Sequence, residues 1–191
     1  MKSTIELIKI GNIDQSILVK LKKKLERIFS LFNLSINIIH GAISLEESEY
    51  DPKRRQYDAL KILKKIINLS KNKQFFRTLG IMDEDIYSNT LNFVFGRAIN
   101  PINRKPEFPI VALISITRLR EKFYRRPENN AIFDLRILKE AIHELGHTFS
   151  LEHCYNSCIM QFSNTLMDTD KKPPQFCESC LKKLTIFFKS L

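Results

Sequence analysis

The stretch HELGHTFSLEHCYNSC at residues 143–158 carries three of the four histidines and two of the four cysteines of this 191-residue chain. His143 and His147 are four residues apart, so on a helix both imidazoles project from one face and reach a single metal ion. Glu144 follows the first histidine and is placed to handle the proton of a water molecule at that ion. The spacing therefore predicts a zinc site.

A third imidazole, that of His153, decides what kind of zinc site this is. On a continued helix His153 would lie about 9 Å beyond His147 and off the shared face. We therefore expect the helix to end near Ser150 and the chain to turn back, so that His153 reaches the same ion. Three histidine ligands with an open fourth position are typical of a catalytic zinc ion.

The cysteines form a second candidate site, because they fall in two pairs that are separated by a long loop. Four thiolates can close a tetrahedral zinc shell with no position for substrate, which predicts a structural ion. Buried thiols without a metal are the alternative. We expect two Zn²⁺ ions, one catalytic and one structural, the second bound by Cys154, Cys158, Cys177 and Cys180.

Hydrophobic periodicity around these sites predicts an α/β fold, with a five-stranded mixed twisted sheet packed with helices. We expect strands at 4–10, 35–43, 77–83, 91–98 and 110–116, and helices from Asp14 to Phe32, around 60–67, at 129–149 and from 178 onward. The whole chain, 1–191, is expected to form one domain. Its 1–149 part ends in the active-site helix, and its 150–191 part is a small subdomain with the cysteine zinc site.

Composition narrows the class of protein further. No segment approaches the roughly 18 uncharged apolar residues of a membrane helix, and Glu6 and Lys9 interrupt any apolar leader, so we expect a cytoplasmic protein. Four cysteines in that reducing compartment favour metal binding over disulfides. The net charge of +10 leaves a nucleic-acid-binding module open. Scattered lysines, and few aromatics or arginines beside the cysteines, disfavour it.

A histidine triad joined directly to a four-cysteine site, with Met160 between the cysteine pairs, resembles the archaemetzincin family of metzincin-type zinc metallopeptidases. The stretches at 79–87, 91–98, 138–147 and 162–172 also resemble family segments: LGIMDEDIY, LNFVFGRA, LKEAIHELGH and FSNTLMDTDKK. The chain departs from the family pattern at Ser150, where metzincins have glycine. The spacing from Cys154 to Cys158 is also one residue tighter.

The resemblance implies a role for each site residue. Glu144 would be the general base and Met160 the Met-turn beneath the site. The ligands of the catalytic zinc would be His143, His147 and His153, and those of the second zinc Cys154, Cys158, Cys177 and Cys180. No group that stabilises the oxyanion is identified besides zinc, with Tyr155 the one candidate.

The resemblance implies hydrolysis of peptide bonds, and one form of this activity would be aminopeptidase-like. Peptide or protein substrates would align on an edge strand near LNFVFGRA. The alternative is a catalytically silent, zinc-dependent peptide- or protein-binding protein, in which a fourth protein group displaces water from the histidine site. Neither hypothesis includes a membrane partner, and neither specifies an oligomeric state.

Overall fold

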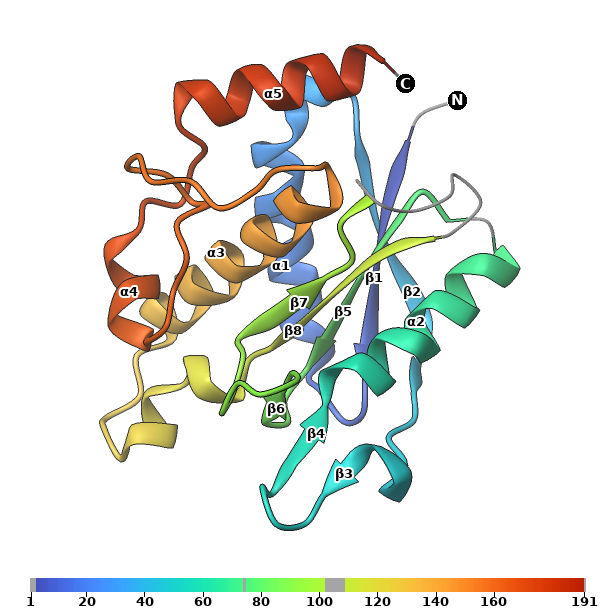
Figure 1. The fold of residues 1–191 in the computed structure, drawn as a ribbon, viewed down its shortest axis with the longest axis vertical. Helices are drawn as coiled ribbons and strands as arrows, with labels where there is room; N and C mark the ends of the chain where they lie inside the picture. Colours follow the sequence, from blue (N-terminus) through green and yellow to red (C-terminus); the bar gives the residue numbers. More distant parts are fainter. Residues whose placement is uncertain (1–2, 74, 102–108, 191) are drawn as a thin grey trace.

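A computed structural model describes residues 3–73, 75–101 and 109–190, and its centre is a five-stranded sheet in the order β2-β1-β5-β8-β7 (Figure 1). Strands β1, β2, β5 and β8 run parallel, and β7 pairs antiparallel with β8, so the sheet is mixed as predicted. The five strands are Thr4–Ile10 (β1), Ser35–Ile43 (β2), Arg77–Met82 (β5), Gly96–Ala98 (β7) and Ile110–Ser115 (β8).

Helices cover both faces of this sheet and give three layers (Figure 1). Strands β5 and β8 are buried throughout, and their side chains alternate between the two faces. Leu79 and Ile81 join the apolar cluster of α1 (Gln15–Ile28) and α3 (Asn130–Thr148). Met82 joins the cluster of α2 (Ala59–Lys73) on the other face. Helix α3 therefore lies directly on the sheet, beside its β7 edge.

The end of α3 is a Schellman motif, which confirms the bend predicted near Ser150. The Ser150 N–H donates to the His147 carbonyl and the Leu151 N–H to the Gly146 carbonyl, each at 3.1 Å. Ser150 takes the left-handed conformation, with φ of 67°, that such an end requires. The serine thus adopts the backbone geometry that glycine adopts most easily.

The structure corrects the predicted strand at 91–98, of which only 96–98 is a strand. Two carbonyls of the preceding segment accept from side chains: that of Leu91 from Arg54 and that of Asn92 from Gln56. The first helix also stops at Ile28 rather than Phe32, and a 3-10 turn follows it.

Several short elements were not predicted. A small second sheet contains Tyr50–Asp51 (β3), Gln56–Asp58 (β4) and Ile86–Tyr87 (β6). A short helix, α4, spans Leu166–Lys171 before the predicted final helix α5, Glu178–Lys189. Their lengths explain the omission, because two to six residues carry too little periodicity to detect.

Residues after α3 return to the main core. Met160 and Leu184 belong to the same buried cluster as Leu145 of α3 and Leu7 of β1. The predicted division of a single domain at residue 149 stays a prediction. Within the described ranges, no helix is both long enough and apolar enough to cross a membrane.

Candidate metal centres

Three imidazoles meet where α3 ends. His143 and His147 lie on the last two turns of α3, and the turn at Ser150 brings back His153. One ring nitrogen from each lies within 4.8 Å of the others, and the Nε2 atoms of His143 and His147 are 3.1 Å apart. Zinc–nitrogen bonds of about 2.0–2.1 Å place two tetrahedral ligands about 3.3 Å apart. The cluster therefore has the dimensions of a zinc site.

Backbone carbonyls orient the two helical histidines. The Nδ1 atom of His143 lies 2.9 Å from the Ile159 carbonyl, and that of His147 lies 2.8 Å from the Leu151 carbonyl. A carbonyl only accepts, so Nδ1 carries the proton and Nε2 is free to bind a metal. Burial lowers the pKa of His147 to about 4 and that of His143 well below its ordinary value. Both rings are therefore neutral near pH 7, as metal binding requires.

Glu144 is buried against the edge strand β7. A Cβ atom added to Gly96 would meet Glu144 Cγ at 2.6 Å and Oε1 at 2.7 Å, so only glycine lets the strand approach this closely. Burial, and then repulsion from Glu140, raise the pKa of Glu144 to about 8, although Lys172 and Arg97 oppose the shift. A carboxyl group with a pKa near neutrality is suited to proton transfer.

A cleft of about 690 Å³ opens over the histidines and Glu144. Its walls come from β7 with the residues around it, from α3, and from the segment that follows Met160. On that last wall the half-exposed ring of Phe162 lies 4.9 Å from the ring of His153. A cleft of this volume, lined by the histidines and Glu144, can hold a segment of a peptide.

Met160 is fully buried against α3, where it contacts Gly146. Its sulfur packs so tightly against Gly146 that a Cβ atom there would overlap it. The Met160 carbonyl accepts from the Cys154 N–H at 3.0 Å, and the preceding residue, Ile159, orients His143. The segment at Ile159 and Met160 therefore bonds to one residue of each cluster, His143 and Cys154. Its role as a Met-turn stays a prediction.

The four cysteines also converge, since one sulfur from each lies within 4.8 Å of the others and none is in a disulfide. The sulfurs of Cys154 and Cys177 are 3.7 Å apart, close to the roughly 3.8 Å that zinc–sulfur bonds of about 2.3 Å give. The N–H groups of Met160 and Cys177 point at the Cys158 sulfur at 3.5 and 3.2 Å. Such donors stabilise thiolates, so this cluster also fits zinc.

Electrostatics at Cys177 favour the thiolate. Burial raises the pKa of this thiol. Hydrogen bonds from the Cys180 N–H, the Asn156 amide and the neighbouring thiols outweigh burial and lower the pKa to about 6. A thiolate near neutral pH is the form that binds a metal.

Two outcomes differ from the sequence-based expectations. Tyr155 is fully exposed and is absent from the cleft lining, so it has no contact through which to stabilise an oxyanion. A buried ion pair between Glu140 and Lys172 lines the cleft and was not predicted, because a charged pair 32 residues apart carries no local sequence signal.

A three-histidine cluster beside a buried glutamate, at the floor of a peptide-sized cleft, defines the class of zinc metallopeptidases. Comparison with known families agrees with this class. The profile of peptidase family M54 matches residues 3–186, and the chain belongs to this family. It is accordingly a zinc metallopeptidase, and the resemblance to archaemetzincins noted from the sequence is confirmed.

Curated relatives and solved structures support the assignment over nearly the whole chain. Archaemetzincin of Pyrococcus furiosus is 38% identical over 186 residues, which cover 96% of this chain and 93% of the relative. Archaemetzincin of Methanocaldococcus jannaschii is 39% identical over 176 residues, which cover 92% and 89%.

Two solved structures have the same fold. Archaemetzincin from Archaeoglobus fulgidus, complexed with malonate, has a TM-score of 0.77 and 30% identity, and the match covers 94% of this chain and 99% of that one. A zinc-dependent peptidase from Methanocorpusculum labreanum has a TM-score of 0.80 and 28% identity, with the same coverage.

Proposed function

We propose that His143, His147 and His153 hold a catalytic zinc ion and that the chain hydrolyses peptide bonds in the cleft above them. The observation that carries this proposal is the convergence of three imidazoles without a fourth ligand. Among the described residues, no other His, Cys, Asp or Glu joins the cluster. A zinc ion held by three protein ligands would keep a position open for water or substrate. It would supply a Lewis acid that polarises the scissile carbonyl and lowers the pKa of water.

We propose Glu144 as the general base. Its carboxylate takes a proton from the attacking water and passes it to the nitrogen of the leaving amine as the carbon–nitrogen bond breaks. The close approach of Gly96 supports this role, because it fixes the carboxyl group between the histidines and the cleft wall. A base held in this way needs no reorganisation when substrate arrives.

Strand β7 is proposed to align the substrate. It is the last strand of the described sheet, and its Gly96–Ala98 backbone lines the cleft. An extended peptide can add to such an edge through main-chain hydrogen bonds, which leaves its side chains to select among substrates. The sequence placed an edge strand in this region, and the sheet order agrees.

We propose that the protein cleaves peptide bonds inside a chain and does not act as an aminopeptidase. Recognition of a free amino terminus needs an anionic group that is not otherwise engaged. Two carboxyl groups from the described residues line the cleft, those of Glu140 and Glu144. Glu140 already pairs with Lys172, and Glu144 is assigned to proton transfer. This distribution of charge favours cleavage within a chain.

We propose that Cys154, Cys158, Cys177 and Cys180 bind a second, structural zinc ion. The cluster links the segment around Met160, which contains Cys158, to the start of α5, where Cys177 and Cys180 lie. A closed shell of four thiolates contributes its binding free energy to folding. This ion would therefore support the loop that carries His153.

The open position distinguishes this proposal from a catalytically silent binding protein. In that alternative a fourth protein ligand would occupy the histidine site, whereas the described residues place only three there. Glu144→Ala separates the two functions experimentally. We expect the variant to keep the zinc content of the parent and to lose peptide cleavage by at least about 100-fold.

The matched control is Glu152→Ala, an exposed glutamate in the same loop as His153. We expect this variant to retain both zinc and activity. Cleavage is measured on a peptide library by mass spectrometry, and zinc by elemental analysis. Undiminished cleavage by Glu144→Ala would rule out the assigned base, and a parent that cleaves no peptide in the library would favour the binding protein.

A further inference from the structure

Unsatisfied polar atoms concentrate at the cleft. In the described part of the chain, three buried side-chain atoms have no hydrogen-bond partner: Ser88 Oγ, Ser163 Oγ and Lys172 Nζ. Ser163 and Lys172 both line the cleft, and Ser88 does not. Leaving a buried donor unsatisfied costs about 1–3 kcal/mol. Glu140 balances the charge of Lys172, but the hydrogen-bonding capacity of both groups is left for a ligand with acceptor oxygens.

The Lys172 ammonium is the stronger of the two donors. Its side chain is 1% exposed, and Nζ lies 2.9 Å from Glu140 Oε1, a contact that is electrostatic rather than hydrogen-bonded. That oxygen also accepts from the Thr169 hydroxyl at 3.0 Å. An ammonium has three N–H donors, so Glu140 leaves donor capacity for a second anion.

Lys172 lines the same cleft as the three histidines and Glu144, so its ammonium group can act on a substrate that is held there. A buried, low-dielectric position strengthens such an interaction relative to water.

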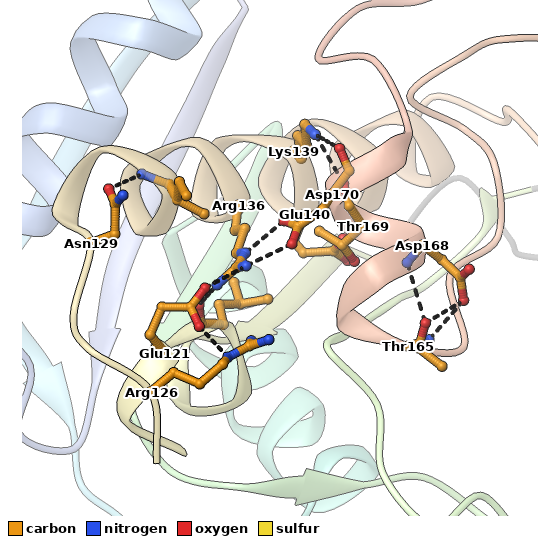
Figure 2. A network of polar contacts seen from close by, with 12 residues as sticks. Glu121, Arg126, Asn129, Arg136, Lys139, Glu140, Thr165, Asp168, Thr169 and Asp170 are labelled. Carbon is orange, nitrogen blue, oxygen red and sulfur yellow. Dashed lines mark hydrogen bonds and ion pairs between the residues drawn. The ribbon is translucent and has the colours of Figure 1, made fainter. Parts of the chain in front are cut away.

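Helix α4, which lies between Ser163 and Lys172 in the chain, is fixed to α3 (Figure 2). Arg136 Nε and Nη2 donate to the two carboxylate oxygens of Asp170, each at 2.6 Å. Lys139 Nζ donates to the carbonyls of Thr169 and Asp170 at 3.0 and 2.8 Å. These contacts hold the segment between Ser163 and Lys172 in place before a ligand binds. Ligand binding to a segment that is already ordered loses little conformational entropy.

We propose that Lys172, assisted by the Ser163 hydroxyl, binds a carboxylate of the substrate and is a specificity-determining residue. A carboxylate is the anionic group that peptides offer, and it accepts from an ammonium and a hydroxyl together. It can come from an acidic side chain near the scissile bond or from the terminal carboxyl group. This inference rests on the proposed function of the cleft.

The test uses a series of peptides in which a single glutamate is placed at each position in turn. Each of these peptides is compared with one that has glutamine at the same position. Every peptide is made with a free and with an amidated carboxyl terminus. Both kcat/KM and Kd, the latter by fluorescence anisotropy, are measured for every peptide. We expect the parent to prefer one carboxylate by about 10- to 100-fold, as charge-assisted hydrogen bonds do. A glutamate preference identifies the side chain, and a preference for the free terminus identifies the chain end.

Three variants complete the design. Lys172→Met should reduce the preference to about one, and Ser163→Ala should reduce it by about 3- to 10-fold. Lys171→Met is the matched control, because this neighbouring lysine is exposed and should leave the preference unchanged. If Lys172→Met fails to fold, the Ser163→Ala result decides.

The outcomes separate this inference from the proposed function. Binding with a carboxylate preference but without cleavage would keep the inference and overturn the proposed function. Cleavage by the parent without any carboxylate preference would overturn the inference alone. An equal loss on all peptides in Lys172→Met would also overturn it, because the lysine would then act on the reaction or on the fold.

Discussion

Ser150→Gly is expected to stabilise the protein, since Ser150 ends α3 with φ of 67°. Such left-handed geometry costs a residue with a Cβ atom about 1–2 kcal/mol relative to glycine. Glycine also has greater conformational freedom in the unfolded chain, which lowers the free energy of unfolding by about 0.5–1 kcal/mol and so offsets part of this gain. The net gain in the free energy of unfolding is therefore about 0.5–1 kcal/mol, or about 1–4 °C in Tm for a chain of this size.

The measurement is urea unfolding of the parent and the variant at the same free zinc concentration, so that the metal contribution cancels. Ser150→Ala is the control, because alanine keeps a Cβ atom in the left-handed conformation and relieves none of the strain. We expect it to match the parent or to be slightly less stable. Equal or lower stability of Ser150→Gly would refute the assignment of strain to this residue.

Three further substitutions test the contacts around the metal centres. Gly96→Ala should displace Glu144, whose Oε1 a new Cβ atom would meet at 2.7 Å, and should slow peptide cleavage by about 100-fold. Its zinc content, measured in parallel, should stay that of the parent. Gly146→Ala should overlap Met160 and lower the free energy of unfolding by about 1–3 kcal/mol, although alanine favours a helix. A variant as stable as the parent in urea would contradict the tight packing. Cys177→Ser should lower stability by several kcal/mol at saturating zinc, because a closed shell loses a thiolate. Thermal unfolding at the parent's Tm would count against a structural ion.

The sequence was informative where patterns are long. Helix α3 was predicted at 129–149 and observed at Asn130–Thr148, because 19 residues of 3.6-residue periodicity and a histidine pair agree. The end near Ser150 followed from the requirement that His153 reach the same ion. Four of the five strands were placed within one residue of their observed bounds.

Short elements and contacts between distant residues could not be predicted from the sequence. Residues 91–95 read as strand from their apolar residues, but Arg54 and Gln56, far away in sequence, take up two of their carbonyls. Helix α4 had one local signal, the capping box of Thr165 and Asp168, but its six residues carry too little periodicity to predict a helix from that signal alone. The Glu140–Lys172 pair had none, because its burial depends on how α4 docks onto α3.

Counting zinc ions by native mass spectrometry shows whether residues 143–180 form two separate metal sites. We expect two zinc ions per chain in the parent, because three imidazoles and four thiolates converge at different points. We expect one in His153→Ala, which removes a ligand from the histidine site alone. One zinc ion or none in the parent, or two in the variant, would rule out two separate sites with these ligands.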